Sequence, residues 1–556
     1  MKQIRYVSGA GKAGVRLANG GYGDLCLNGQ GMRRTMCDAE ITSYGSNGEP
    51  IMSTKPELAM SRRRFMQTAT LASAGLCLGP HWAFGQIDVT KPMKREMGRL
   101  HFEATTLGLG GQASLQRTPA DVEPTKIILK AFNLGINYFD TSNAYGPSQS
   151  NYGKAFRELQ LIPGQPGYKE STRRSIFLTS KTMLRFAKGG WKKEGLRSFS
   201  NGPQGSGAAE DLKRSLTQIF GDGQGYYPPG SYLDMVLIHN LTTREEMDAV
   251  YEGLAKPDPR AENIGALAAL VDYRDGTNLT GLNPKEDKLI RHIGFSGHHS
   301  AAVMMEMIQR DERNIFDAML VAINANDRLN FNMQYNVIPV AVAKNMGLIA
   351  MKVFADGAMY TKPATWSNKP EHVVRTVGST TLPSRPLVQY ALSTPGIHTA
   401  IIGTGQISDD PESCQLRQNL SAAQVAPHGL TTSDRLAIEK MASTAKDGKT
   451  NWFQRPKEGM TPPREALAEQ EMHDGKRVIR LKWQTAFAGD EPIARYEIWR
   501  DHRKISEVSH QPQISRKPFV FEEVIDDSAA HNYQVTTVDT AGRNAPTAEL
   551  LVPNVG

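Results

Sequence analysis

Asp140 and Tyr145 stand five residues apart in the stretch Gly135–Gly146, GINYFDTSNAYG. An apolar run with aromatic and β-branched residues ends in Asp140, and Tyr145 follows in a polar turn. A carboxylate at the end of a buried strand and a phenol in the next loop suit acid–base chemistry. An Asp also commonly caps a turn after a strand, so the positions of further ionisable residues decide between the two interpretations.

Two more ionisable residues follow the next two apolar runs. Lys181 comes at the end of IFLTSK, and His239 lies at the end of LDMVLIHN. Alone, a Lys after a strand is usually solvated, and a His after an apolar run is more often a satisfied core residue. Four such residues from three consecutive strands favour a catalytic site over both of these structural roles.

These four residue types support proton transfer coupled to hydride transfer. A free Tyr has a pKa near 10, and a nearby ammonium group is expected to lower the pKa of Tyr145. The Asp140 carboxylate would pair with Lys181 and hold it in place. His239 could then hydrogen-bond to the substrate oxygen and orient it. The hydride itself must come from a cofactor.

The elements that must position these residues alternate between strands and helices from about residue 100 to 425. This order predicts a parallel sheet, and eight repeats predict a closed (β/α)8 TIM barrel, an α/β fold. The eight predicted strands are Thr105–Leu109, Asn137–Asp140, Ser175–Ser180, Asp234–His239, His292–Ser296, Ala318–Ile323, Leu348–Val353 and His398–Ile402. An open doubly wound sheet is the alternative, but Gly108–Gly111 lacks the GxGxxG spacing of a dinucleotide-binding strand.

Helices are predicted between these strands. They cover Pro124–Leu134, Ser150–Leu159, Ala208–Phe220, Thr243–Leu254, Ser300–Arg310, Val337–Asn345, Arg385–Ser393 and Glu412–Ala422, with a further helix at Thr431–Ala445. Three long segments look like loops or insertions: Leu184–Gly207, Gly223–Gly230 and Pro257–Pro284. Long loops after barrel strands build the rim of an active site.

The ordered motifs DTSNAYG, TSK, LIHN, GFSG, MKVF and IIGTG with QLRQNL resemble the aldo-keto reductases over about residues 100–425. The resemblance implies a (β/α)8 barrel that binds a nicotinamide cofactor, usually NADP(H), with NAD(H) as the alternative. It implies a tetrad of Asp140, Tyr145, Lys181 and His239, with Tyr145 as general acid/base. The implied cofactor-binding residues are Ser296, Asn324, Gly403, Thr404, Arg417, Gln418 and Asn419.

The N-terminal region differs from the rest in composition. Residues 1–51 are rich in Gly, Asn and Ser. This composition indicates either a disordered segment or a sequence that extends upstream of the true start codon, with Met52 and Met60 as alternative initiators. Residues 52–85 carry SRRRFM, a short apolar run and a small-x-small site, which together resemble a twin-arginine signal peptide. We therefore expect export to the periplasm or outside by the twin-arginine machinery, and a cytoplasmic location if the signal is not used.

The C-terminal region changes to short alternating strands. The barrel domain is predicted at 100–447, a linker at 448–464 and a small all-β sandwich at 465–556. The stretches YEIWRDHRKI and YQVTTVDTAGRNA resemble fibronectin type III domains. Trp499 or Tyr496 would suit sugar stacking, but the alternation places at least one of them in the core. A structural or protein-contact role is favoured over carbohydrate contact.

Composition limits the function classes. The net charge is +8, but residues 1–85 hold ten Lys and Arg against five acidic residues, so little of it remains elsewhere. Nothing therefore indicates a nucleic-acid partner. The four Cys include no CxxC pair, and no metal site is predicted.

Two functions fit the sequence. The first is an exported NAD(P)-dependent oxidoreductase that acts on a small carbonyl or alcohol substrate, with a sugar as one candidate. The second is a nucleotide-binding regulatory or scaffold protein on the same barrel, without significant turnover. The complete tetrad favours the enzyme.

Overall fold

In the computed structural model, residues 91–190, 195–360 and 362–555 are described. The predicted N-terminal region and signal peptide, at 1–85, lie outside these residues. Within the described ranges, no helix is both long and apolar enough to cross a membrane.

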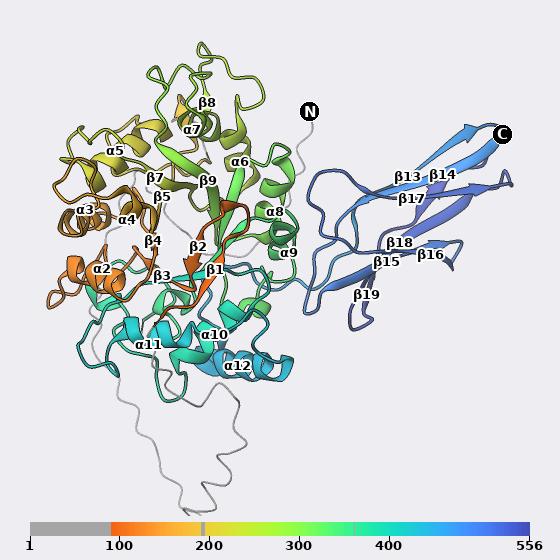
Figure 1. The fold of residues 1–556 in the computed structure, drawn as a ribbon. Coiled ribbons are helices and arrows are strands. Elements are labelled where there is room, and N and C mark those ends of the chain that lie inside the picture. Colours follow the sequence, from red (N-terminus) through yellow and green to blue (C-terminus); the bar gives the residue numbers. More distant parts are fainter. Residues whose placement is uncertain (1–90, 191–194, 361, 556) are drawn as a thin grey trace, which may run out of the picture. The chain divides into compact units, whose positions relative to one another are not determined.

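Eight parallel strands close into a barrel, as the sequence predicts (Figure 1). The strands are β3 (Leu107–Gly110), β4 (Tyr138–Asp140), β5 (Phe177–Thr182), β7 (Leu233–Ile238), β9 (Ile290–Gly297), β10 (Phe316–Ala322), β11 (Gly347–Met351) and β12 (Thr399–Ile402). They neighbour one another in chain order, and β12 pairs with β3 to close the ring. Every residue of β5 and β7 is buried, as expected for strands covered on both faces.

Helices surround the barrel strands in Figure 1. They are α2 (Pro124–Asn133), α3 (Ser148–Glu158), α4 (Glu170–Arg174), α5 (Ala208–Phe220), α6 (Arg244–Tyr251), α7 (Ala266–Asp275), α8 (Ala301–Arg310), α9 (Val337–Ala343), α10 (Ser384–Ser393), α11 (Gln415–Ala422) and α12 (Thr432–Thr444). Apolar spacing explains their packing: in α5, Leu212, Leu216 and Ile219 share one buried face. The helix begins at Ala208 because the Glu210 side chain accepts a hydrogen bond from the Gly207 amide.

Two helices were not predicted. Helix α7 lies within Pro257–Pro284, which the sequence indicated as an insertion. All but two residues of the helix are buried. The segment is therefore part of the barrel's outer layer. The short α4 precedes β5 and places the buried Arg173 against Asp234 of β7, with a nitrogen–oxygen distance of 2.8 Å.

Small two-stranded sheets add to the barrel. The strands β1 (Lys94–Glu96) and β2 (Glu103–Thr105) pair antiparallel before the first barrel strand. In the long loop after β5, β6 (Phe186–Lys188) pairs antiparallel with β8 (Ile264–Gly265). The second pairing links two of the three predicted long loops, so part of the loop rim is ordered by backbone hydrogen bonds.

The chain after α12 returns to the mouth of the barrel. Residues 448–464 were predicted as a linker, and several of them make specific contacts. The Asn451 side-chain amide bonds that of Asn324, and Gln454 donates to Asp327 at 2.7 Å. Phe453 is buried in the barrel core. The first part of this segment is therefore built into the barrel rather than extended between domains.

The C-terminal region is a small all-β sandwich, as predicted. One sheet has the order β13 (Arg464–His473), β14 (Lys476–Gln484) and β17 (Phe519–Ile525). The other sheet has the order β16 (Arg503–Ser509), β15 (Ile493–Arg500), β18 (His531–Asp539) and β19 (Asn544–Pro546), and β20 (Leu550–Val552) also pairs with β18. Tyr496 and Trp483 are fully buried between the sheets. The likeness to fibronectin type III domains stays a prediction.

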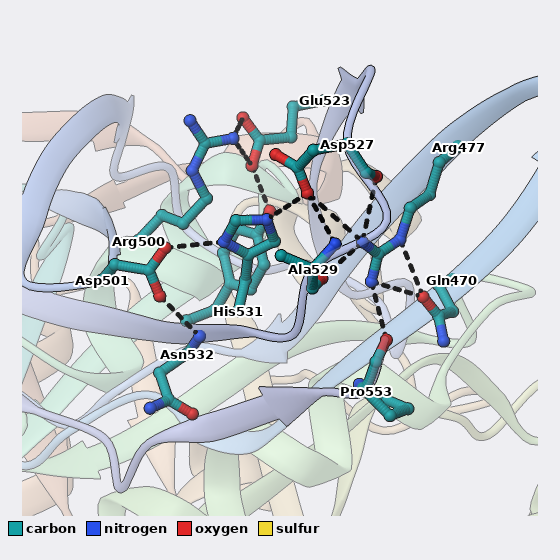
Figure 2. Close-up of polar contacts among 11 residues, drawn as sticks. Gln470, Arg477, Arg500, Asp501, Glu523, Asp527, Ala529, His531, Asn532 and Pro553 are labelled. Atoms are coloured by element: carbon teal, nitrogen blue, oxygen red, sulfur yellow. Dashed lines mark hydrogen bonds and ion pairs between the residues drawn. The ribbon is translucent and has the colours of Figure 1, made fainter. Parts of the chain in front are cut away.

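In the sandwich, His531 lies between the carboxylates of Asp501 and Asp527 and contacts both (Figure 2). His531 Nδ1 lies 2.6 Å from Asp501 Oδ2, and its Nε2 lies 2.8 Å from Asp527 Oδ1. Hydrogen bonds to both carboxylates raise the pKa of His531 above its usual value. The backbone amide of Asn532 and the His531 ring in turn lower the pKa of Asp501. The imidazole thus joins the turn after β15 to the loop before β18.

We expect the stability of the sandwich to decrease as pH rises through the folded-state pKa of His531. A raised folded pKa contributes stability fully below the unfolded value of about 6.5, and the contribution is lost above the folded value. His531→Gln should remove this dependence and cost on the order of 1 kcal/mol at about pH 6. Hydrogen exchange of β15 and β18 peptides in the full-length protein measures the change.

The exposed His473 of β13 provides the matched control, because its side chain is 75% exposed. His473→Gln should leave exchange in β15 and β18 unchanged. Equal stability of wild type and His531→Gln at about pH 6 would show that the contacts of His531 with Asp501 and Asp527 contribute nothing to the stability of the sandwich.

Candidate active site

The structure brings the four predicted catalytic residues together at the C-terminal ends of neighbouring strands. Asp140 is the last residue of β4, Lys181 lies near the end of β5, and His239 directly follows β7. Tyr145 comes from the loop after β4, and its side chain is turned back over these strand ends. All four are buried, and Tyr145 retains 7% exposure. Parallel pairing of β4, β5 and β7 fixes this arrangement.

The tetrad has two direct contacts. Lys181 Nζ donates to Asp140 Oδ1 at 2.5 Å and to the Thr141 carbonyl at 2.8 Å. Tyr145 Oη lies 3.4 Å from His239 Nε2. The Lys181 ammonium also lies 4.8 Å from the centroid of the Tyr145 ring. The carboxylate therefore positions the ammonium beside the phenol, and the phenol faces the imidazole.

Burial governs the protonation of Tyr145 and His239. It raises the pKa of Tyr145 well above 10, and the Asp140 carboxylate raises it further. This differs from the expectation that Lys181 lowers that pKa, because desolvation of the phenolate is the larger effect here. Burial and the Lys181 ammonium hold the pKa of His239 well below 6.5. The site therefore presents a phenol that holds its proton beside a neutral imidazole.

A second charged group lies beside the tetrad. Lys352 follows β11, and its Nζ lies 2.8 Å from Gln112 Oε1 and 3.3 Å from Asp356 Oδ1. Lys362 Nζ donates to the other oxygen of Asp356 at 3.0 Å. The three charged side chains are at most 7% exposed. Two ammonium groups thus share one carboxylate, which leaves a buried net positive charge at the mouth of the barrel.

A cavity runs from the tetrad along the ends of β3, β11 and β12. Its lining includes Asp140 and Tyr145 of the tetrad, the charged Lys352 and Asp356, and the backbone of Gly403. A separate hollow also includes Tyr145, together with His239 and Trp366. Tyr145 and Gln112 border both spaces. The phenol therefore borders two spaces that a cofactor and a substrate could occupy.

The predicted cofactor residues near the strand ends differ in their surroundings. Gly403 lines the cavity, and the Thr404 amide is held by Ser114 Oγ at 3.0 Å. Ser296 is fully buried in β9, and its Oγ accepts a hydrogen bond from the Asn240 amide at 2.9 Å. Ser296 thereby fixes the backbone next to His239.

Asn324 follows β10, and its side-chain amide is engaged within the protein. Its Nδ2 donates to the Lys352 carbonyl at 3.1 Å and to Asn451 Oδ1 at 2.9 Å. Its Oδ1 accepts from the Asn326 amide at 2.9 Å. In this structure Asn324 therefore anchors the segment after α12 to the barrel mouth.

The three predicted residues of α11 point in different directions. Arg417 lines a hollow with Lys126 and Lys130 of α2, away from the tetrad cavity. Gln418 donates to the Pro411 carbonyl at 3.0 Å, and Asn419 is buried. The neighbouring Gln415 instead holds the turn after β12, because its Oε1 accepts from the amides of Gly405 and Gln406.

Several side chains at the site were not predicted: Gln112, Lys352, Asp356, His298 and Trp366. Lys352 carried a usable signal, because it is the polar residue that ends the strand in MKVF. His298 directly follows β9 and carried the same signal. Trp366 lies in a long loop, where neither periodicity nor strand ends place a residue.

A family model described as "Aldo/keto reductase family" matches residues 106–426, which is more than half of the chain. The chain belongs to the aldo/keto reductase family. No curated protein matches its sequence. Among solved structures, a Klebsiella pneumoniae aldo/keto reductase in complex with NADP and acetate is 15% identical, with 63% of this chain and 96% of that chain covered and a TM-score of 0.37. A Bombyx mori aldo-keto reductase in complex with NADP is 16% identical, with 64% and 94% covered and a TM-score of 0.40.

Proposed function

We propose that this family member is a nicotinamide-dependent oxidoreductase that interconverts a carbonyl and an alcohol, with Tyr145 as general acid/base. The observation that carries the proposal is the contact of Tyr145 Oη with His239 Nε2 at 3.4 Å, beside the buried Lys181–Asp140 pair. A phenol and an imidazole that face one point can both hydrogen-bond to a single substrate oxygen.

The cofactor that the family implies is NADP(H), with NAD(H) as the alternative. The cavity beside the tetrad offers such a group a buried ammonium, because Lys352 lines it together with Asp356 and would attract a diphosphate. The backbone at Gly403 lines the cavity without a side chain, and a Cβ there would lie 3.2 Å from Ser114 Oγ. Gly403, which lines the cavity, would contact the cofactor, and the bound cofactor would supply the hydride.

In the reductive direction, the protein's own residues place and protonate the substrate oxygen. The high pKa of Tyr145 keeps its proton available for the developing alkoxide, and His239 orients the same oxygen as a neutral partner. Lys181 stabilises the phenolate that remains, through an ammonium held by Asp140. Positioned proton transfer of this kind contributes about 10²- to 10⁴-fold to the rate.

Tyr145→Phe tests this role. We expect kcat/KM for carbonyl reduction to fall by about 10²- to 10⁴-fold, because the ring stays in place while the acidic proton is lost. Nucleotide binding, measured by fluorescence titration, should be retained. Tyr226→Phe is the matched control, since Tyr226 is 60% exposed and lines neither the cavity nor the hollow that borders Tyr145.

The alternative function is a nucleotide-binding regulatory or scaffold protein without significant turnover. The engagement of Asn324 within the protein favours it slightly, because that amide is not free to hold a cofactor. Under this alternative Tyr145→Phe changes no function and wild type shows no turnover. Full catalytic activity of Tyr145→Phe would instead contradict the role of the phenol.

We further propose that the enzyme is exported through the twin-arginine pathway, on the basis of Ser61–Met66 alone. Replacing Arg62, Arg63 and Arg64 by Lys keeps the charge but removes the guanidinium pair. In a bacterium with this pathway, the variant should remain in the cytoplasm while wild type reaches the periplasm, as cell fractionation would show. Arg33→Lys with Arg34→Lys is the control and should be exported; export of the triple variant would overturn the proposal.

For the sandwich we propose a contact role with protein or carbohydrate. Trp499 borders a shallow hollow on the outer face of β15 and β18, together with Asn532 and Gln534. Tyr496 is in the core and takes no part. Binding of the full-length protein to a glycan array would be abolished by Trp499→Ala if carbohydrate is the partner. A lack of binding by wild type would leave protein contact as the proposed role.

A further inference from the structure

His239 has a hydroxyl group at each of its two ring nitrogens. Its Nε2 lies 3.4 Å from Tyr145 Oη, and its Nδ1 lies 3.4 Å from Ser142 Oγ. Both distances are long, as is common for catalytic hydrogen bonds before a substrate binds and tightens them. In the described part of the chain, Ser142 is the only hydrogen-bonding partner of Nδ1. Ser142 is therefore placed to decide which ring nitrogen carries the proton.

Ser142 is held firmly in the loop after β4, where it is fully buried. Its carbonyl accepts a hydrogen bond from the Tyr145 amide at 3.1 Å. Its Oγ accepts one from the Ala144 amide at 3.2 Å. These two contacts close the turn that carries the phenol. The same residue thus supports the backbone of Tyr145 and contacts the imidazole of His239.

The backbone of His239 is also fixed on both sides. Its amide donates to the Thr182 carbonyl at 2.8 Å, and its carbonyl accepts from Arg185 Nη1 at 2.9 Å. The ring lies edge-on to the Tyr145 ring, with 5.6 Å between the two centroids. Since His239 is only 7% exposed, water has little access to the ring. The two hydroxyl groups therefore govern where the ring proton lies.

The hydroxyl proton of Ser142 has two acceptors within reach. One is His239 Nδ1, and the other is the Lys181 carbonyl, which lies 3.4 Å from Oγ. The Lys181 carbonyl already accepts a hydrogen bond from the Asn143 amide at 3.1 Å. It therefore gains less from a second donor than a buried ring nitrogen gains from its first. Donation from Ser142 Oγ to Nδ1 leaves the ring proton on Nε2.

The position of the ring proton matters for carbonyl reduction. A neutral imidazole has one N–H group and one bare nitrogen. With the proton on Nε2, His239 donates to the same substrate oxygen as Tyr145 Oη. With the proton on Nδ1, the bare Nε2 would face the lone pairs of that oxygen and repel it. Only the first arrangement lets both side chains hold a carbonyl oxygen.

We propose that Ser142 is a positioning residue, which donates its hydroxyl hydrogen bond to His239 Nδ1 and thereby holds the ring proton on Nε2. This inference rests on the proposed carbonyl reduction and adds the residue that prepares His239 as a donor. The hydroxyl keeps its proton throughout, so Ser142 takes no part in the transfer of a proton to the substrate. Its effect on the reaction runs through the orientation and tautomer of His239 alone.

NMR of protein labelled with ¹⁵N-histidine reads the tautomer directly, because a protonated and a bare ring nitrogen resonate far apart. His239→Gln identifies the His239 signals by their loss. We expect the proton on Nε2 in wild type and a mixture of both tautomers in Ser142→Ala. Ser148→Ala is the matched control and should keep the wild-type tautomer. Ser148 is equally buried and near in the chain, but its Oγ contacts Thr141 Oγ1, at 2.9 Å.

Kinetics in two backgrounds separate positioning from a structural role. Ser142→Ala keeps the carbonyl contact with the Tyr145 amide and loses only the hydroxyl. We expect kcat/KM for reduction of para-nitrobenzaldehyde by NADPH to fall about 10-fold, with NADPH affinity unchanged. In a His239→Gln background the same substitution should have little further effect, because no imidazole remains to be oriented.

A wild-type His239 that carries its proton on Nδ1 would overturn the inference, because Ser142 would then accept rather than donate. An equal loss of activity in both backgrounds would also overturn it and would leave Ser142 a structural role. The wild-type spectrum decides the point even if Ser142→Ala does not fold. If wild type binds NADPH but turns over no aldehyde, the proposed function fails, and the spectrum still decides the role of Ser142.

Discussion

The buried pair of Lys181 and Asp140 is the interaction on which the rest of the site depends. Both side chains are at most 2% exposed, and their charged atoms lie 2.5 Å apart. Neither charge would be tolerated alone at this depth, since desolvation of an unpaired ion costs several kcal/mol. The pair is possible because β4 and β5 are adjacent and parallel, so their carboxyl ends meet. It places an ammonium beside Tyr145, and burial of the tetrad follows from the same packing.

Two spaces border Tyr145, and their linings differ in charge. Lys352 and Lys362 share Asp356 on the cavity side, which leaves an excess of buried positive charge there. On the other side, His239 and His298 are neutral and the walls carry aromatic rings. The cavity side of Tyr145 thus carries buried charge, whereas the hollow side carries neutral imidazoles and aromatic rings. Tyr145 borders both and can transfer a proton to a substrate oxygen placed between them.

The strands, and the positions of Asp140, Lys181 and His239 at strand ends, could be predicted from the sequence because local rules determine them. Apolar runs bounded by polar turns predicted all eight barrel strands. Ionisable residues that directly follow such runs indicated Asp140, Lys181 and His239. Helix α7 was missed because a helix inside an insertion has no neighbouring strand pattern to indicate it. Asn451 and Trp366 reach the site from segments with no periodicity, so only tertiary packing places them. The direction of the Tyr145 pKa also required the structure, since it depends on how completely the phenol is buried.

The most direct test of this account is to identify and titrate the nucleotide. Protein purified without added nucleotide would be denatured and the released material identified by mass spectrometry. The emptied protein would then be titrated with NADPH and NADH. The account predicts release of a nicotinamide nucleotide, or saturable binding with a Kd in the micromolar range or below. Purification as an empty protein that binds neither nucleotide at about 1 mM would contradict it, and would leave the tetrad as part of a scaffold without catalysis.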